Sequence, residues 1–381
     1  MLVLAILFWS SIALIVWTQL GYALALAGLA RLRRPRPAGP PGGELPRLSL
    51  IVAAHDEEQV IAAKVANALA LEYPRELFEL IVACDGCADA TAERARAAGA
   101  DLVLELPRGG KIRAQDAAVE RAAGAVLAFS DANALWEPDA ARTLVAAFED
   151  PAVGYACGQV RFTRAGAGGE VPNQEGVYWR YEMAIRGWES KLSSITAGNG
   201  AIYATRRDSY LRVDPIMGHD LSLPFNMVKL GLRAVYVPEA RASEKMVPTL
   251  GGEFARKRRM MSHTWPILIR GGMLSPRGYS PGYAGMIVSH RLLRYGSPGL
   301  HLIALAANAA LLALGAGPLY AVTLALQLGL LAAALLAGPL RARPLLLARY
   351  YVLTTASPAA GLWDWLRHGT AASWEAAEGT R

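Results

Sequence analysis

Two oxygen-bearing side chains placed two residues apart are the first feature of this sequence that could do chemistry. Asp131 and Asn133 follow an apolar run, in the segment Ser-Asp-Ala-Asn. In an extended chain, residues i and i+2 face the same side. Their oxygens could then hold one Mg²⁺ or Mn²⁺ ion and leave positions open for a diphosphate. The spacing predicts a metal site, with an ordinary turn as the alternative.

Two further charged residues are placed to contact a nucleotide. Lys111 follows the pair Gly109–Gly110, and a lysine on a glycine loop can neutralise phosphate charge. Asp85 opens the segment Asp-Gly-Cys-Ala-Asp, where its carboxylate can accept hydrogen bonds from a base or a ribose. A solvated lysine and an Asx turn are the alternatives. For Asp89, at the end of that segment, capping of the next helix is the better explanation.

A third aspartate comes from a separate part of the chain. Asp220 lies in Met-Gly-His-Asp-Leu, and an aspartate that enters a site from its own segment is placed to act as a general base. The neighbouring His219 could tune Asp220 or contact the metal. A structural hydrogen bond explains His219 better.

The cysteines suggest neither a disulfide framework nor a metal site. Cys84 and Cys87 form a CxxC motif, and Cys157 stands alone. A tetrahedral zinc site needs more ligands, and the sequence has no second CxxC and no nearby pair of histidines. We interpret Cys84 and Cys87 as small residues of a tight turn.

Apolar runs alternate with helical patterns between residues 48 and 129, which predicts a mostly parallel sheet covered by helices. In such a sheet the ligand lies beyond the carboxyl ends of the strands, where the polar segments described above also fall. No GxGxxG follows the first predicted strand and no Walker A motif is present, so the common dinucleotide-binding and P-loop α/β enzymes are excluded. The predicted strands are 48–53, 78–83, 102–105 and 125–129, and the predicted helices are 57–71, 90–98 and 112–123.

The composition points to a membrane protein. The chain is 53% hydrophobic and 19% charged, and residues 1–30 carry no charge and are long enough to span a bilayer. The basic, proline- and glycine-rich linker 31–47 follows, which by the positive-inside rule puts the rest of the chain in the cytoplasm. The net charge of +7 suits an anionic membrane surface better than nucleic acid.

The C-terminal third adds further apolar segments. Residues 251–297 are expected to form interfacial amphipathic helices. The region 298–362 contains two predicted spans, 299–316 and 319–337. A third segment, 345–362, is either a span or re-entrant, and a polar tail, 363–381, ends the chain.

Six motifs occur in an order that resembles membrane-bound family-2 glycosyltransferases, including ceramide-glucosyltransferase-like and polysaccharide-synthase-like members. The resemblance implies a GT-A fold, a Rossmann-like nucleotide-diphospho-sugar transferase domain over residues 48–250. It also implies inverting transfer from a nucleotide sugar, usually UDP-linked. The motifs are IVAAHDEEQVI, ACDGCADAT, GGKIRAQDAAVERAAG, FSDANA, AGNGAIYATRR and GHDLSLPFNMVKLG.

The resemblance also implies roles for single residues. It places the catalytic base at Asp220, the Mg²⁺ or Mn²⁺ ligands at Asp131 and Asn133, donor contacts at Asp56, Glu57, Asp85, Lys111 and Asp131, and acceptor contacts at Gly198, Asn199, Gly200 and Trp265. The sequence departs from the family where Asp56 replaces asparagine and Asn133 replaces the second aspartate. In the QxxRW motif of processive synthases only Trp265 is kept, since Met261 and Thr264 replace glutamine and arginine.

These observations predict a multi-pass enzyme of the inner (plasma) membrane with a cytoplasmic catalytic domain. It would move a sugar to a lipid-embedded or membrane-proximal acceptor, such as a glycolipid of the cell envelope. The degraded QxxRW motif favours single addition over a processive polysaccharide synthase that secretes a glycan. A non-catalytic membrane subunit that binds nucleotide sugar is a minor alternative. The expected partners are the donor, a lipid or glycan acceptor and the bilayer, without nucleic acid. The sequence does not indicate an oligomeric state.

Overall fold

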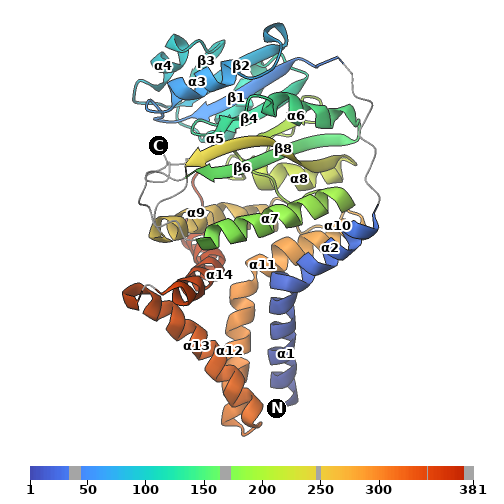
Figure 1. The fold of residues 1–381 in the computed structure, drawn as a ribbon, viewed down its shortest axis with the longest axis vertical. Coiled ribbons are helices and arrows are strands. Elements are labelled where there is room, and N and C mark those ends of the chain that lie inside the picture. Colours follow the sequence, from blue (N-terminus) through green and yellow to red (C-terminus); the bar gives the residue numbers. More distant parts are fainter. Residues whose placement is uncertain (34–43, 164–172, 246–249, 341, 373–381) are drawn as a thin grey trace.

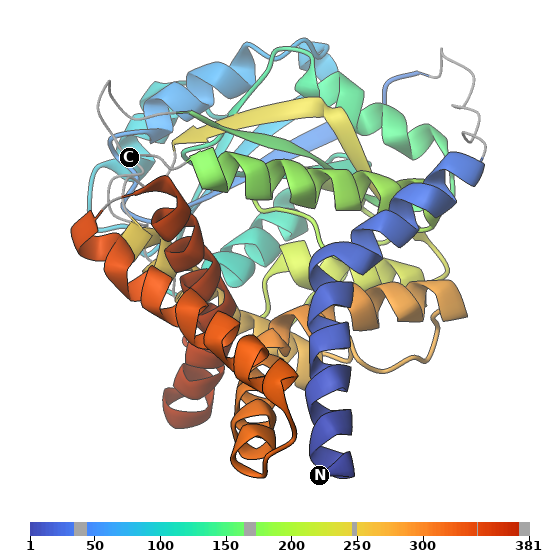
Figure 2. The same ribbon diagram turned by 60° about the horizontal axis from the view of Figure 1, so that its bottom comes forward.

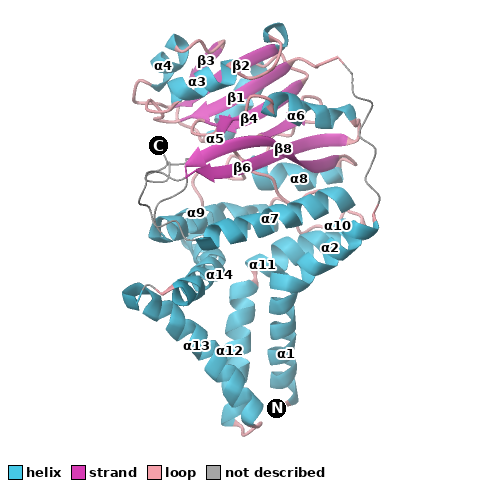
Figure 3. Cartoon of the chain, viewed as in Figure 1, coloured by secondary structure: helices cyan, strands magenta, loops and turns pink. Residues whose placement is uncertain are grey.

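The computed structural model describes residues 1–33, 44–163, 173–245, 250–340 and 342–372. A sheet with helices on both faces forms one end of the molecule. A layer of helices lies beneath the sheet, and a group of apolar helices projects away from it (Figure 1, Figure 3).

The sheet has eight strands in the order β3-β2-β1-β4-β7-β6-β8-β5. Its first half is parallel, as the sequence predicts: β3 (Leu102–Leu106), β2 (Phe78–Asp85), β1 (Leu48–Ala54) and β4 (Val126–Asp131). The second half is mixed, because β7 (Tyr203–Arg206) runs antiparallel between β4 and β6 (Val153–Thr163). It is completed by β8 (Arg233–Lys245), parallel to β6, and β5 (Leu135–Trp136), antiparallel to β8. The expectation of a mostly parallel sheet, made for residues 48–129, is therefore confirmed, and every antiparallel pairing involves a strand beyond β4.

Strand β1 shows why the sheet is buried on both faces. All seven of its residues are buried. Leu50 and Val52 belong to one apolar core, whereas Ile51 and Ala53 belong to the other, as the two-residue period of a strand requires.

Helices cover each face of the sheet. The core that contains Leu50 takes residues from α3 (Ile61–Leu69), α4 (Thr91–Ala97) and α6 (Ala140–Ala146). The core that contains Ile51 takes residues from α5 (Lys111–Arg121), α7 (Asn173–Leu192) and α8 (His219–Lys229). The predicted helices 90–98 and 112–123 are confirmed within a few residues, and the helix predicted at 57–71 begins only at Ile61.

The apolar helices lie at the other end of the molecule (Figure 2). The N-terminal segment is continuous, from α1 (Leu2–Val16) through a π-helical stretch (Trp17–Gly21) to α2 (Tyr22–Leu32). By length and composition, Leu2–Leu32 and α13 (Pro318–Leu340) can cross a membrane. A third crossing would need α10 (Pro281–Met286), the π-helical Ile287–Leu292 and α11 (Leu293–Tyr295) to join α12 (Ser297–Ala313) across a 62° bend.

The last helix, α14 (Arg343–His368), does not meet that criterion. It packs along α9 (Leu250–Ile269), to which it is tied by a bidentate ion pair of 2.6 Å per contact between Arg258 and Asp364. The segment 345–362, left open by the sequence, is therefore the middle of one helix that packs on a neighbour. The helix continues into the predicted polar tail, of which residues 373–381 lie outside the described part of the chain.

Candidate active site

Lys111, Asp131 and Gly200 meet beyond the carboxyl end of β4. Asp131 is the last residue of β4, Lys111 is the first residue of α5, and the Lys111 ammonium donates a hydrogen bond to the Asp131 carboxylate. A Cβ atom on Gly200 would lie 3.1 Å from Nζ of Lys111 and 3.2 Å from Oδ2 of Asp131. The predicted phosphate-binding lysine, a predicted metal ligand and the predicted acceptor loop thus form one cluster.

The geometry expected for Asn133 is wrong in one respect. Residues 132–133 form a turn, in which the amide of Ala134 donates to the carbonyl oxygen of Asp131 (3.2 Å). The argument from an extended chain therefore does not apply, because the chain reverses after Asp131. The half-buried Asn133 and the Asp131 carboxylate, which is 32% exposed, still offer oxygen ligands of the kind that Mg²⁺ and Mn²⁺ take. The metal role of both residues stays a prediction.

Asp85 fixes the glycine pair that precedes Lys111. Its buried carboxylate, at the end of β2, accepts hydrogen bonds from the amides of Gly109 (2.6 Å) and Gly110 (3.0 Å). Gly110 has φ of +96°, a conformation that glycine adopts without strain. Asp85 therefore positions the start of α5, and contact with a base stays a prediction.

The loop before β7 links Asp220 to this cluster. The amide of Gly198 donates to the carbonyl oxygen of Asp220 (2.6 Å), and the carbonyl of Gly198 accepts from Nη2 of Arg186 (2.9 Å). A Cβ atom on Gly198 would lie 1.9 Å from the hydroxyl of Tyr155, so only glycine fits. The loop is held rigidly between α7, α8 and the sheet.

Asn199 uses its amide to shape the same loop. Its Nδ2 donates to the carbonyl of Gly158 (2.8 Å), and its Oδ1 accepts from the amides of Ala201 (3.1 Å) and Ile202 (2.9 Å). These contacts set the course of the chain into β7. They give Asn199 a positioning role, and its predicted contact with an acceptor remains untested.

The electrostatics of the cluster suit a base beside a bound phosphate. Burial raises the pKa of Asp220, an effect that the positive charge of Lys111 partly offsets. Burial on its own lowers the pKa of Lys111, but the carboxylate of Asp131 outweighs it, so the pKa of Lys111 is raised and the ammonium stays charged.

His219 has the structural role that the sequence favours. Its ring is buried, with Nδ1 2.9 Å from the hydroxyl of Tyr203 and the ring edge against Phe129. Burial lowers the pKa of His219 to about 3, so the imidazole is neutral. Asp89 forms an Asx turn instead of the predicted cap: its Oδ1 accepts from the amide of Thr91 (3.0 Å), whereas the N-cap position of α4 is occupied by Ala90.

Two charged residues of the site escaped the sequence analysis. Lys64 on α3 is fully buried, and its Nζ donates to the carbonyl of Ala134 (2.6 Å), in the turn that follows Asp131. Glu244 on β8 lies close enough to Asp131 for burial and that charge together to raise the pKa of Glu244. The only sequence signal for a role of Lys64 was its position in an apolar helix. Glu244 lies in a charged stretch of the kind usually found on a protein surface.

Asp56 and Glu57 lie at the end of β1, next to the turn that follows β2. Asp56 has φ of +49°, and its Oδ1 accepts from the amide of Ala88 (2.8 Å). The amide of the buried Glu57 donates to Oγ1 of Thr91 (2.8 Å). Both residues lie at the same edge of the sheet as Asp85, which holds the glycine loop. Their contacts with the donor stay predictions.

Trp265 is committed to helix packing. Its Nε1 donates to the carbonyl of Pro358 on α14 (2.8 Å). The basic run after Gly252 is also engaged: Arg256 pairs with Glu253 (2.9 Å), and Lys257 donates to the hydroxyl of Tyr350 (3.0 Å). None of these contacts links Trp265 to the Lys111–Asp131 pair.

The segment after α14 reaches the glycine loop. A Cβ atom on Gly110 would lie 2.2 Å from the carbonyl oxygen of Ala372. Thr370 donates from Oγ1 to the carbonyl of Ser262 on α9 (2.8 Å), which anchors this segment. Ala372, within the predicted tail 363–381, thus lies beside the residue that precedes Lys111.

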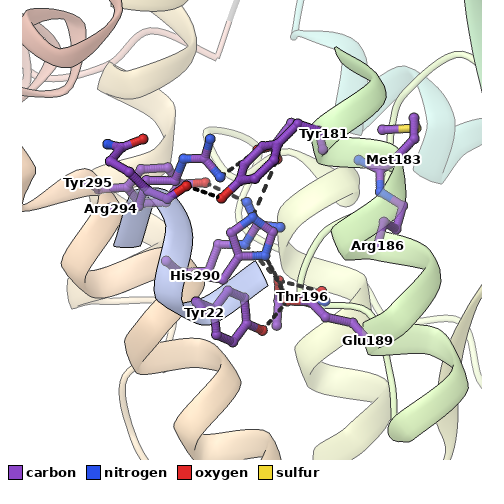
Figure 4. A network of polar contacts seen from close by, with 12 residues as sticks. Tyr22, Tyr181, Met183, Arg186, Glu189, Thr196, His290, Arg294 and Tyr295 are labelled. Carbon is purple, nitrogen blue, oxygen red and sulfur yellow. Dashed lines mark hydrogen bonds and ion pairs between the residues drawn. The ribbon is translucent and has the colours of Figure 1, made fainter. Parts of the chain in front are cut away.

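A buried polar cluster joins the apolar helices to the loop that carries Gly198 (Figure 4). We call it the junction cluster. Glu189 on α7 is its centre and accepts from the hydroxyl of Tyr22 (2.7 Å) and the amide of Thr196 (3.0 Å), with Nδ1 of His290 at 2.7 Å. Beside it, Arg294 pairs with Glu182 (2.5 Å). The junction cluster consists of Tyr22, Glu182, Glu189, Thr196, His290, Arg291 and Arg294.

Known proteins resemble this chain both in sequence and in fold. An N-acetylglucosaminyltransferase of Mesorhizobium japonicum (strain LMG 29417 / CECT 9101 / MAFF 303099) is 27% identical over 243 residues. That match covers 58% of this chain and 57% of the relative, so the chain spans little more than half the length of that protein. Among solved structures, a mannosyltransferase of Pyrobaculum calidifontis in complex with GDP-Man and Mn²⁺ superposes with a TM-score of 0.73 at 24% identity.

The structural match covers 95% of this chain and 99% of the mannosyltransferase, which shows a GT-A-like fold with flanking apolar helices. A glucosyl-3-phosphoglycerate synthase of Mycobacterium tuberculosis matches more weakly, with a TM-score of 0.41 at 20% identity over 59% of this chain and 84% of that one. The profile of the glycosyltransferase-like family 2 matches residues 46–262, which is more than half of the chain. The chain therefore belongs to glycosyltransferase family 2 and is a glycosyltransferase.

Proposed function

We propose that this enzyme transfers a sugar, with inversion, from a nucleotide donor to an acceptor embedded in or close to the membrane. The observation that carries the proposal is the cluster of Lys111, Asp131, Gly200 and Asp220, built from α5, β4, the loop before β7 and α8. A cationic residue, a carboxylate for a metal and a buried base are the groups that such a transfer needs.

The donor diphosphate would lie beside Lys111 and Asp131. Mg²⁺ or Mn²⁺, bound through Asp131 and Asn133, would supply positive charge that stabilises the leaving diphosphate. Lys111 adds a fixed positive charge at the same place. The mannosyltransferase from Pyrobaculum was solved with Mn²⁺ and GDP-Man, which supports a divalent cation and makes GDP as well as UDP a candidate nucleoside diphosphate.

Asp220 would act as the base. The acceptor hydroxyl forms a bond to the anomeric carbon while the bond from that carbon to the diphosphate oxygen breaks. The hydroxyl proton goes to the Asp220 carboxylate, and the nucleoside diphosphate leaves. Because base and leaving group act from opposite faces of the sugar, the anomeric configuration inverts. The raised pKa of Asp220 makes it a stronger base than an exposed aspartate.

The helices beside the site favour a lipid acceptor at the cytoplasmic surface of the plasma membrane. Helices α2, α7, α9 and α10 form a layer between the sheet and the projecting helices (Figure 1). Their shared apolar core includes Leu26, Ile185 and Ile267. Since two helices are long and apolar enough to span a bilayer, this layer would lie at the membrane surface, within reach of an acceptor lipid.

The test is transfer by the full chain in detergent. UDP- and GDP-sugars would be offered with Mn²⁺ or Mg²⁺, with and without a membrane lipid extract, and the products identified by mass spectrometry. A lipid with one added sugar is the expected product. A ladder of masses would replace this proposal with a processive synthase. Asp208, an exposed aspartate, provides the matched control: Asp208→Asn should retain transfer that Asp220→Asn loses.

A further inference from the structure

Three side chains with metal-binding atoms gather away from Asp131. His55 and Asp56 follow β1, and Cys87 lies in the turn after β2. One ligand atom from each of the three residues lies within 4.8 Å of the ligand atoms of the other two. The sequence analysis set aside a metal role for Cys87 because no second ligand pair was visible. The fold supplies those ligands from the neighbouring strand.

The histidine is oriented as a metal ligand would be. Nδ1 of His55 lies 2.7 Å from the carbonyl oxygen of Asp85, which can only accept, so Nδ1 carries the proton. Nε2 is then the ring nitrogen that can bind a metal, and it lies 3.5 Å from Oδ2 of Asp56. A hydrogen bond from one ring nitrogen to a backbone carbonyl is the usual support of a metal-bound histidine, because it fixes the tautomer and the ring plane.

The other two ligands are held in place as well. Asp56 is fixed by its left-handed backbone conformation and by the amide of Ala88, which donates to Oδ1 (2.8 Å). The half-buried Cys87 sulfur lies 3.6 Å from the carbonyl oxygen of Ala54, to which its thiol donates, so this contact fixes the position of the sulfur. A metal would replace the thiol proton, because the thiolate is the form that binds metals.

We propose that His55, Asp56 and Cys87 bind a borderline-soft divalent cation such as Zn²⁺ through Nε2, a carboxylate oxygen and Sγ. Tetrahedral zinc with these ligands needs donor atoms about 3.3–3.8 Å apart, so small side-chain rotations from the observed spacing suffice. A mixed sulfur, nitrogen and oxygen set selects zinc over Mg²⁺ or Mn²⁺. The site therefore differs in chemistry from the oxygen ligands at Asp131. Three protein ligands leave one coordination position open to solvent, since the Asp56 side chain is 44% exposed.

The position of the site gives it a consequence for the enzyme. It lies at the ends of β1 and β2, beside Asp85, whose carboxylate holds the amides of Gly109 and Gly110. A cation there would withdraw Asp56 from the donor contact proposed for it. This step rests on the proposed function. If that function holds, Zn²⁺ should weaken donor binding without displacing Mn²⁺ from Asp131.

Cobalt reports on the site independently of transfer activity. Co²⁺ would be titrated into the full chain in detergent with excess Mg²⁺ present to occupy the oxygen site. A thiolate-to-cobalt charge-transfer absorption that Zn²⁺ abolishes at one equivalent is the expected result. Cys87→Ser should remove the absorption, and His55→Gln should weaken cobalt binding at least tenfold. The matched control is Cys157→Ala, which removes a buried cysteine on β6 and should leave the absorption unchanged.

Several results would overturn the site. The wild-type protein could lack the charge-transfer absorption, or the absorption could persist in Cys87→Ser. His55→Gln could also bind cobalt with the same affinity as the wild type. Thermal melting of each variant shows whether it is folded, and His55→Gln keeps the test open if Cys87→Ser is not. If cobalt binds as expected but Zn²⁺ leaves donor binding unchanged, the site stands and only its proposed effect on the donor is lost.

Discussion

The proposed transfer reaction depends on the carboxylate of Asp220 more than on any other single group. Replacement by asparagine keeps the shape of the side chain and removes the base, so transfer should fall about 10²–10⁴-fold. Donor binding should change little, because Lys111 and Asp131 remain. Transfer rates and donor affinity of Asp220→Asn measure the two effects separately. Turnover close to that of the wild type would show that another group takes the proton.

The raised pKa of Asp220 also predicts a pH dependence. The base works only when it is deprotonated, so kcat/KM should fall as the pH drops through the pKa of Asp220. Because burial raises that pKa, the fall should occur above the ordinary aspartate value of about 3.9. Glu244 also has a raised pKa, and the acid limb should persist in Glu244→Gln. A limb that disappears in that variant would assign the titration to Glu244.

The same shift has a consequence for stability. An acid whose pKa is raised by folding stabilises the folded state at low pH, and this contribution is lost as the pH rises through the raised pKa. At neutral pH the ionised Asp220 therefore costs stability. Asp220→Asn should melt at or above the wild-type temperature at neutral pH, although it is inactive. A clearly lower melting temperature would show that the carboxylate holds α8 in place.

The glycines of the loop before β7 can be tested against each other. Gly198→Ala places a methyl group against the Tyr155 hydroxyl, and overpacking of this kind costs about 1–3 kcal/mol. Gly200→Ala meets the ends of two side chains, Lys111 and Asp131, so it should disturb donor binding more than stability. Gly282, with open space around it, serves as the control. Denaturant unfolding and donor affinity of the three variants give the comparison, and an equal loss of stability in Gly200→Ala would contradict it.

At the scale of helices and strands, the junction cluster ties α2 to the loop before β7. Glu189 bonds to Tyr22 on α2 and to the backbone of Thr196, two residues before Gly198. Glu189→Ala would leave the Thr196 amide buried without its acceptor and would remove the negative charge beside Arg291. Loss of one member of a buried charged pair costs about 3–5 kcal/mol.

The expected result is a lower melting temperature together with reduced transfer, although Glu189 makes no contact with Asp131 or Lys111 in the described residues. Tyr22→Phe removes one hydrogen bond only and should cost about 0.5–1.5 kcal/mol. If Tyr22→Phe proved as damaging as Glu189→Ala, the hydroxyl of Tyr22 and not the carboxylate would be the centre of the junction cluster.

The elements that the sequence predicted well are those with a local pattern. Strands β1, β2 and β4 are short apolar runs that end at or just before an aspartate or a histidine, and α5 follows a glycine pair, so these elements could be predicted from the sequence. Strand β8 could not be predicted, because its sequence carries several charges and only five of its thirteen residues are buried. The same holds for contacts between distant segments. Nothing near Glu189, Lys64 or His55 in the sequence indicates Tyr22, Ala134 or Cys87 as partners, since the fold alone brings them together.

For the whole molecule, the arrangement of the helices limits the ways in which it could lie in a membrane. The N-terminus and the connection between α12 and α13 lie together at the end farthest from the sheet (Figure 1, Figure 2). Helix α1 packs on α12 there, through Phe8, Ala304 and Leu311. If the apolar helices enter a bilayer, this end must lie inside or beyond it, and the sheet must remain on the side where the helices enter.

The basic residues after Leu32 should place that entry side in the cytoplasm. Single cysteines in a background without Cys84, Cys87 and Cys157 would test this prediction with a membrane-impermeant thiol reagent on right-side-out vesicles. Gly315→Cys, in the connection between α12 and α13, should react in intact vesicles. Arg75→Cys, on the exposed edge of the sheet domain before β2, should react only after permeabilisation. The reverse pattern would put the catalytic cluster outside the cell, where nucleotide sugars are not made. Equal labelling of both sites in intact vesicles would mean that the helices lie on the membrane instead of crossing it.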